Sequence, residues 1–409
     1  METHLAEFIR HTPEGREAEA ILRACTHCGF CTATCPTYQL LGDELDGPRG
    51  RIYLMKQVLE GAPATKKVQL HLDRCLTCRA CETTCPSGVK YGRLADIGRA
   101  VIERQVDRTR FQRLVRGALR TVLPRPWIFN PLLRLGQLVR PLLPPVLQKS
   151  VPMRQLPTPC PTPRHSRRMV VLDGCVQPGI APNINAAAAR VLDRLGISLV
   201  RAGRPACCGA VSYHLNAQEE GLHYARRLID AWWPHVEQGA EAIVITATGC
   251  GAMVAEYGHL LRHDPGYAAK AARVSALAKD VSQVITAERE RIVELLDGKP
   301  RPKLAFHAPC TLQHALKLRG VVEELLRGAG FDLTPVPNAH LCCGSAGTYS
   351  LLQPELSQQL LRNKVAALTS GKPELIATAN IGCLTHLSSG TNLPVKHWIE
   401  VLDEAMAAA

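Results

Sequence analysis

Eight of the seventeen cysteines in this 409-residue chain stand in two copies of one short pattern. Both copies have the form Cys-x2-Cys-x2-Cys-x3-Cys-Pro without deviation. The first copy contains Cys25, Cys28, Cys31 and Cys35, and the second contains Cys75, Cys78, Cys81 and Cys85. Four thiols held within eleven residues leave the local backbone few choices, so this pattern constrains the fold more than any other feature of the sequence.

The spacing is that of bacterial two-cluster ferredoxins, in which three thiolates of a run bind one [4Fe–4S] cluster and the fourth binds the other. Three cysteines spaced in this way wrap a short loop around one face of a cluster, and the proline then turns the chain away. Zinc also binds four thiolates, usually as Cys-x2-Cys pairs separated by a longer loop. Four cysteines per run exceed what one zinc needs, so the pattern favours two cubane clusters over zinc or disulfides.

The formal net charge of +13 raises the question of a nucleic-acid partner. The sequence has no helix-turn-helix or RNP-type signature, and only 4% of its residues are aromatic, so base stacking has little to act on. We therefore expect no nucleic-acid binding. The first 23 residues lack the apolar segment of a signal peptide, and no run of about eighteen apolar residues occurs, so we expect a cytoplasmic protein.

Helical patterns surround the two cysteine runs. We expect helices over residues 5–24, 51–60, 68–73 and 92–106. Clusters joined by helices rather than by a β-hairpin predict an α-helical ferredoxin domain with two [4Fe–4S] motifs over residues 1–110.

Residues 111–167 have the composition of a connector. An amphipathic helix is expected over 111–123, followed by a proline- and leucine-rich stretch with Trp127 and Phe129, and by a linker over 152–166. A basic amphipathic segment can lie on an anionic membrane surface, and it can also pack between domains or under a partner subunit.

From residue 169 onward, short apolar runs alternate with helical patterns, which predicts α/β structure and gives the whole chain the fold class α + α/β. Helices are expected over 183–195 and 217–238. The expected parallel strands are 169–173, 198–201, 242–247, 303–306, 333–336 and 375–379.

This half of the chain is duplicated. The first unit, residues 168–300, contains Cys175, Cys207, Cys208 and Cys250, and the second, residues 301–409, contains Cys310, Cys342, Cys343 and Cys383. In each unit a single cysteine precedes a Cys-Cys-Gly triplet by 32 residues, so we interpret the units as homologous.

The loops that carry these cysteines are expected to converge at the carboxyl edge of each sheet, where ligands bind. Three interpretations stay open for them: a further iron–sulfur cluster in at least one unit, a thiol–disulfide redox pair, or inert buried thiols.

Two ferredoxin runs followed by two Cys-Cys-Gly (CCG) units resemble a family of iron–sulfur subunits. It includes the heterodisulfide reductase catalytic subunit and the iron–sulfur subunits of anaerobic glycerol-3-phosphate dehydrogenase and of glycolate oxidase (glycolate dehydrogenase). Residues 21–53 and 72–88 are similar to the last almost residue for residue, and the resemblance covers essentially the whole chain. The wider family ends each CCG unit in Cys-x-x-Cys, whereas Met253 and His386 stand here, which argues against disulfide-reducing chemistry.

The resemblance implies an electron-transfer subunit of a complex that oxidises glycolate to glyoxylate, with lactate as a further candidate substrate. The implied partners are two flavoprotein-type subunits that carry FAD, and the implied acceptor is in the membrane, near the quinone pool. The chain would then be peripheral on the inner face of the inner membrane. The implied ligands are Cys25, Cys28, Cys31 and Cys85 for one cluster, and Cys75, Cys78, Cys81 and Cys35 for the other.

We find no flavin- or nucleotide-binding motif, so we expect no catalytic residue and no substrate oxidation by the isolated chain. The alternatives are the iron–sulfur subunit of a glycerol-3-phosphate or lactate dehydrogenase, a catalytic subunit similar to heterodisulfide reductase, and a zinc-stabilised basic binding module.

Overall fold

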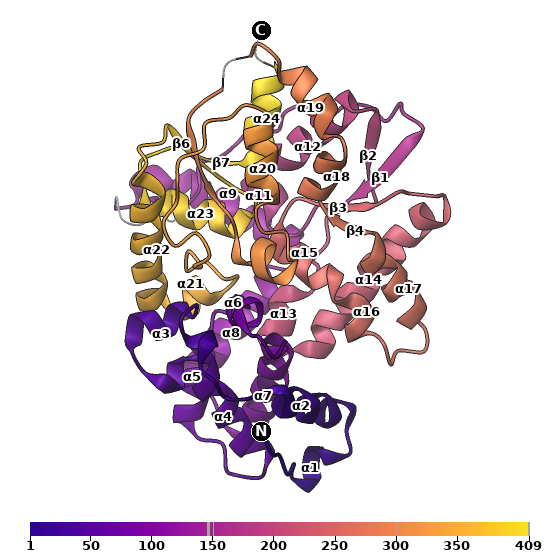
Figure 1. Cartoon of the computed structure of the whole chain (residues 1–409). Helices are drawn as coiled ribbons and strands as arrows, with labels where there is room; N and C mark the ends of the chain where they lie inside the picture. Colours follow the sequence, from indigo (N-terminus) through magenta and orange to yellow (C-terminus); the bar gives the residue numbers. More distant parts are fainter. Residues whose placement is uncertain (145–147, 150, 300, 408–409) are drawn as a thin grey trace. The chain divides into compact units, whose positions relative to one another are not determined.

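The computed structural model describes residues 1–144, 148–149, 151–299 and 301–407 (Figure 1). Positions 145–147 and 150 of the predicted connector, and positions 300 and 408–409 at the ends of the predicted α/β units, lie outside the described residues. The chain divides into two compact units. Unit 1 comprises Met1–Gly117 and His340–Lys364, and unit 2 comprises Ala118–Ala339 and Val365–Ala409. The domain boundaries expected from the sequence stay a prediction.

Unit 1 is helical, as expected. Its elements are α1 (Glu7–Arg10), α2 (Pro13–Ala24), η1 (Phe30–Thr32), α3 (Pro36–Leu41), η2 (Glu44–Asp46), α4 (Pro48–Leu59), α5 (Lys66–Asp73), α6 (Ala80–Thr84), α7 (Tyr91–Gln105) and α21 (Tyr349–Leu352). The helix expected over 5–24 is divided in two, because Pro13 begins α2 and the Thr12 side chain caps it by accepting from the Gly15 N–H. Leu22, Met55 and Leu94 lie in the core that joins these helices.

The elements given for the described part of the connector are α8 (Arg110–Val122), α9 (Pro126–Val139) and the 3₁₀ turn η3 (Arg140–Leu142). Helix α8 matches the helix expected over 111–123. Helix α9 was not expected, because its segment is rich in proline; Pro126 nevertheless stands at the first helical turn, where the missing N–H costs nothing. Residues 152–164 contain no helix or strand, in agreement with a linker.

Unit 2 contains two parallel sheets. The first has β1 (Arg167–Val171), β2 (Ile197–Arg201), β3 (Ile243–Ile245) and β4 (Ala278–Asp280) in the order β2-β1-β3-β4. The second has β5 (Leu304–His307), β6 (Leu375–Thr378) and β7 (Val395–His397) in the order β5-β6-β7. An isolated parallel bridge between Leu333 and Leu304 lies where β2 stands in the first sheet, so the duplication predicted from the cysteines is repeated in the topology.

The strand expected over 333–336 is reduced to that single bridge. The Thr334 N–H still donates to the Leu304 carbonyl (2.9 Å), but Pro335 and Pro337 have no N–H to continue the ladder. Strands β4 and β7 were not predicted, because the sequences Ala-Lys-Asp and Val-Lys-His carry almost no apolar pattern.

Helices surround both sheets in unit 2. They are α11 (Gln177–Ile180), α12 (Asn183–Arg194), α13 (Ala210–His214), α14 (Gln218–Glu237), α15 (Thr248–Ala255), α16 (Tyr257–Leu260), α17 (Ala268–Leu277), α18 (Val281–Ala287), α19 (Arg289–Leu296), the π-helical turn η4 (Thr311–Ala315), α20 (Val321–Gly328), α22 (Pro354–Thr369, which begins in unit 1), α23 (Ile381–Gly390) and α24 (Trp398–Ala407). The helices expected over 183–195 and 217–238 are α12 and α14.

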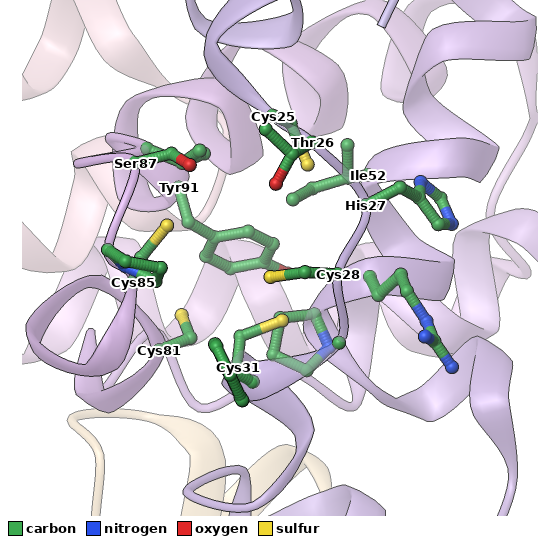
Figure 2. A pocket seen from close by; sticks show the side chains of 16 residues that line it. Cys25, Thr26, His27, Cys28, Cys31, Ile52, Cys81, Cys85, Ser87 and Tyr91 are labelled. Atoms are coloured by element: carbon green, nitrogen blue, oxygen red, sulfur yellow. The ribbon is translucent and has the colours of Figure 1, made fainter.

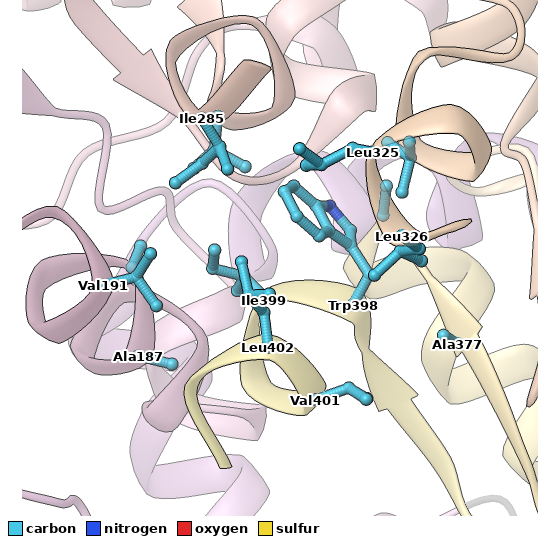
Figure 3. Close-up of a cluster of buried hydrophobic side chains, with 14 of the residues drawn as sticks. Ala187, Val191, Ile285, Leu325, Leu326, Ala377, Trp398, Ile399, Val401 and Leu402 are labelled. Atoms are coloured by element: carbon cyan, nitrogen blue, oxygen red, sulfur yellow. The ribbon is translucent and has the colours of Figure 1, made fainter. Parts of the chain in front are cut away.

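One apolar core joins the two sheets of unit 2. Trp398 and Ile399 of α24 lie against Val191 of α12, Ile285 of α18 and Leu326 of α20, and all five are essentially buried (Figure 3). Because elements of both repeats contribute to this core, the parts of the two repeats that belong to unit 2 are expected to fold as one body.

Candidate metal centres

The two cysteine runs have the same backbone conformation at equivalent positions. His27 and Gly29 in the first run, and Thr77 and Arg79 in the second, all have positive φ, between 53° and 89°. Left-handed residues on either side of a cysteine curl the loop tightly, which is the backbone that a compact anionic group needs. A Cβ at Gly29 would lie 2.5 Å from Nη1 of Arg49, so a larger residue there would displace the Arg49 side chain.

A pocket in unit 1 is lined by thiols from both runs. Cys25, Cys28 and Cys31 of the first run and Cys81 and Cys85 of the second line it, with the ring of Tyr91 beside them (Figure 2). The pocket holds about 420 Å³ including its open mouth, and none of the described residues that line it is acidic. Five thiols around a hollow without competing carboxylates suit a cluster of soft, cationic metal ions, and four of them are the quartet that the sequence analysis expects for one cluster.

The electrostatics of this pocket also favour a bound metal cluster. Burial raises the pKa of Cys31 to about 11, and the neighbouring Cys25, Cys28 and Cys85 add to the rise. Thiolates crowded together in a buried place repel one another, so a bound cation is what would hold them ionised.

A second group of thiols lies nearby in unit 1. Burial raises the pKa of Cys81 well above its usual value, and Cys78, Cys75 and Cys35 raise it further by their proximity. Cys35, the last cysteine of the first run, therefore lies with the first three of the second run. The structure thus brings together the two quartets expected from the sequence, and the assignment of a cluster to each stays a prediction.

Two buried arginines face the second quartet. Burial alone would raise the pKa of Cys75, but Arg51 and Arg99 outweigh it and lower this pKa. The Tyr91 hydroxyl also donates a hydrogen bond to Sγ of Cys75 (3.5 Å), and the Thr77 N–H does so at 3.4 Å. This quartet is therefore surrounded by positive charge and donors that stabilise negative charge on sulfur.

Arg51 is held in place by a buried network. Its Nε donates to the His71 carbonyl (2.7 Å), and its Nη2 lies 3.4 Å from Oδ1 of Asp46. The fully buried Asp46 carboxylate also lies 3.0 Å from Nδ1 of His71 and 2.8 Å from Nη1 of Arg74. Asp43, Asp46 and His71 are close enough to ligate a cation, but the two arginines already neutralise the Asp46 carboxylate.

The cysteines of the first α/β repeat also come together. Cys207 is hydrogen-bonded to Cys175 and Cys208, and Cys208 to Cys250. These contacts raise the pKa of Cys207 and lower that of Cys208. The arrangement can bind a metal or form a redox pair.

The backbone around this first group is tightly specified. Gly209 has φ 88°, and a Cβ there would lie 2.3 Å from the Gly221 carbonyl oxygen. The buried Tyr257 hydroxyl donates to the Cys208 carbonyl (2.7 Å). The glycine of the Cys-Cys-Gly triplet is therefore needed for both its φ and its close approach to another backbone.

The second α/β group is distributed over both units. Cys342 and Cys343 belong to unit 1, Cys310 and Cys383 belong to unit 2, and all four are buried. Within unit 1, the Tyr349 hydroxyl donates to the carbonyl of Arg74, the residue before Cys75 (3.1 Å). Burial raises the pKa of Tyr349, and Cys75 and Cys342 raise it further, so the second Cys-Cys-Gly triplet approaches the second ferredoxin quartet.

The charged side chains around the two cysteine quartets were not predicted from the sequence. Arg49 and Arg51 follow the first run closely, but their sequence positions alone gave them no expected role. Arginines soon after a cysteine run are a usable signal, but Asp46, His71 and Arg99 become visible only when the helices are packed. Cys160 is exposed and takes part in neither group, and none of the seventeen cysteines forms a disulfide.

Comparison with known proteins gives two family matches. Residues 21–89 match the 4Fe-4S dicluster domain, and residues 169–255 and 304–388 each match the cysteine-rich domain CCG. The chain is 58% identical over 407 residues to the glycolate oxidase iron-sulfur subunit of Escherichia coli, which covers 99% of both chains. It is 32% identical over 412 residues to the probable glycolate oxidase iron-sulfur subunit of Bacillus subtilis, covering 93% of this chain and 92% of that one.

A shorter relative is similar over part of the chain. Lactate utilization protein A of Bacillus velezensis is 30% identical over 238 residues, which is 56% of this chain and 96% of that protein. None of the helices in the described parts of the chain is long and apolar enough to cross a membrane.

Proposed function

Because this chain belongs to the family of glycolate oxidase iron–sulfur subunits, we propose that it carries electrons from the flavin of a partner subunit to a membrane acceptor while glycolate is oxidised to glyoxylate. Membership in this family makes it an electron-transfer component of an oxidoreductase complex with other subunits. The proposed partners are two flavoprotein-type subunits that carry FAD, and the chain itself supplies no catalytic residue. We place it at the inner face of the inner membrane.

The observation that carries the proposal is the grouping of the ferredoxin cysteines. Two [4Fe–4S] clusters would supply one-electron transfer. The first would be held by Cys25, Cys28, Cys31 and Cys85, and the second by Cys75, Cys78, Cys81 and Cys35. Tyr91 lines the first pocket and donates to Cys75 of the second quartet, which supports a path that crosses from one quartet to the other.

Protein groups would set the direction of electron flow. Cys28 is exposed, so the first quartet is the one open to a partner. Arg51 and Arg99 favour added negative charge at the second quartet. Electrons arriving at the first quartet would then move toward the second, and Tyr349 extends the same path toward Cys342.

We further propose an additional iron–sulfur cluster in the α/β part. The first candidate set is Cys175, Cys207, Cys208 and Cys250, whose mutual hydrogen bonds support a shared ligand. The repeated set, Cys310, Cys342, Cys343 and Cys383, is the second candidate. A thiol–disulfide pair or inert thiols are the alternatives, and metal and sulfide analysis distinguishes them.

A second candidate function is electron transfer in lactate oxidation. The similarity to lactate utilization protein A favours it, although that similarity covers only 56% of this chain. The choice of 2-hydroxy acid would lie in the flavin subunit, so both substrates belong in the same test.

The test is anaerobic reduction by substrate. The purified chain should contain at least about eight irons with matching acid-labile sulfide, about four for each cluster. Glycolate should bleach its absorbance only when the flavin subunits are present, and lactate serves as the parallel substrate. Bleaching of the isolated chain by glycolate would contradict the electron-carrier role, and a colourless, sulfide-free protein would remove it entirely.

A further inference from the structure

Helix α9 packs against the rest of unit 2 through a side that contains Asn130 and Gln137 together with Leu133. Helices α9 and α11 are in contact, and a Cβ added at Gly179 of α11 would be 2.3 Å from the Asn130 side-chain oxygen. Further along α9, Gln137 donates to the Pro152 carbonyl (3.2 Å). Just after it, Arg140 donates to two backbone carbonyls of the following loop. The side of the helix that can form hydrogen bonds is therefore turned toward the protein.

The opposite side of α9 presents large apolar residues to solvent. Trp127, Leu138 and Leu142 have 74%, 77% and 86% of their surface exposed, and Leu132 and Leu135 are more than half exposed. Their spacing of three and four residues places Trp127, Leu135, Leu138 and Leu142 along one side. A surface helix normally buries its apolar side, so α9 and η3 have the reverse orientation.

Helix α8 has the same reversed orientation. Arg116 forms an ion pair with Asp73 (3.1 Å), and Arg120 donates to Glu220 (2.9 Å), so its basic side is turned toward the protein. Phe111 and Leu114, by contrast, are among the exposed large apolar residues. An arrangement that occurs in two successive helices is unlike the isolated exposed leucine of an ordinary surface.

The charged residues around this apolar side indicate what it binds. From residue 108 to residue 172 the sequence has thirteen arginines and lysines and no aspartate or glutamate. Arg134, Lys149 and Arg154 in this stretch are exposed beside α9. Tryptophan and leucine on one side of a helix, flanked by cations without anions, are typical of helices that lie in an anionic lipid surface. Hot spots of protein–protein interfaces, in contrast, are poor in leucine.

We propose that the outward side of α9 and η3 is a docking surface for an anionic lipid bilayer, in which Trp127, Leu135, Leu138 and Leu142 enter the headgroup region. The helix lies in the plane of the surface and does not cross it. This inference rests on the proposed function to the extent that it brings the electron carrier to a membrane acceptor, and it names the element that does so.

Vesicle flotation tests the docking surface. The iron–sulfur-loaded full chain is mixed with vesicles of phosphatidylcholine alone, or of phosphatidylcholine with phosphatidylglycerol. The wild type should float with the anionic vesicles and much less with the neutral ones, and added salt should weaken its binding. Leu135→Asp with Leu138→Asp should lower binding at least about tenfold, because two leucines no longer enter the bilayer. Val293→Asp, at an exposed apolar position of α19, is the matched control and should bind as the wild type does.

Three outcomes overturn the proposal. These are a wild type that ignores anionic vesicles, a double variant that floats as well as the wild type, and a double variant that loses only its partner subunits. Iron, sulfide and glycolate-dependent reduction are measured on the same samples. Normal clusters without vesicle binding remove only the docking surface, and vesicle binding without clusters removes only the proposed function.

Discussion

Nη1 of Arg51 lies 4.0 Å from Sγ of Cys35, and only 1% of the Arg51 side chain is exposed. A buried guanidinium at this distance stabilises negative charge on the sulfur far more than an exposed one does. Among the described residues that line the pocket of the first quartet, the one arginine is Arg49, whose Nε is paired with Glu44 (2.6 Å). The two quartets therefore lie in unequal electrostatic environments.

Arg51→Gln should lower the reduction potential of one cluster. A unit charge about 6 Å away contributes roughly 3 kcal/mol at an effective dielectric constant of about 20, on the order of 100 mV for one electron. Redox titration followed by EPR should show one signal shifted and the other nearly unchanged. Arg49→Gln is the control, and it should shift the first signal much less because Arg49 is solvated. Equal shifts of both signals in the Arg51 variant would contradict the assignment.

The same substitution should also destabilise the protein, because it leaves the buried Asp46 carboxylate with one cation fewer. The expected loss is about 3 kcal/mol in the free energy of unfolding. Adding Asp46→Asn removes the uncompensated charge and should restore part of this stability, and it should also raise the potential part of the way back because a nearby negative charge is lost. Denaturation of both variants separates the structural effect from the electrostatic one.

Tyr91→Phe should have a smaller and more specific effect. It removes the hydroxyl that donates to Sγ of Cys75 but keeps the ring that lines the first pocket. Stability should fall by only about 1 kcal/mol, and the potential of the second cluster should fall while that of the first is retained. EPR-monitored titration measures this, and an unchanged potential would show that the hydroxyl does not act on the cluster.

Serine substitutions test how the runs share their cysteines. Cys85→Ser should weaken the same EPR signal as Cys28→Ser, although the two cysteines are in different runs, and Cys35→Ser should weaken the same signal as Cys78→Ser. Each change should lower iron content by up to about four atoms per chain. Cys160→Ser is the control, since this exposed cysteine belongs to neither quartet. Pairing by run instead of across runs would contradict the crossed arrangement.

The spacing within each run predicted that its cysteines would gather in one place, because ligand spacing is a local property; the crossed assignment of thiols to two clusters stays a prediction. The sequence also predicted the duplicated α/β part, because the spacing of the cysteines repeats even where the strands have little apolar pattern. It could not predict β4 and β7, which are strands through pairing with β3 and β6 rather than through their own pattern.

The side chains that surround the cysteine ligands are brought there by packing, so they could not be predicted from the sequence. Asp46, Arg51 and Arg99 come from three separate segments, and nothing local indicates that a charged side chain will be buried. Which side of α9 faces the protein could not be predicted either. An apolar stripe indicates an amphipathic helix, but it does not say which side of that helix contacts the protein.

A buried histidine in unit 2 should make the stability of the protein depend on pH. His397 is fully buried, its Nε2 donates to the Thr246 carbonyl (2.9 Å), and its Nδ1 accepts from the Ile399 N–H (3.2 Å). Burial lowers the pKa of His397 to about 4 from an ordinary value of 6.5. Between these values the unfolded chain binds a proton that the folded chain excludes. Stability should therefore be complete above pH 6.5 and fall by about 3 kcal/mol as the pH drops toward 4.

His397→Gln should flatten this dependence, although the variant is less stable at pH 7.5 because it loses one of the two hydrogen bonds. Urea unfolding at pH 7.5 and 5.5 measures the difference, and the wild type should lose more stability than the variant between the two. His263→Gln at an exposed position is the control and should keep the wild-type slope. Parallel slopes for the wild type and His397→Gln would mean that His397 is not the group that titrates on unfolding.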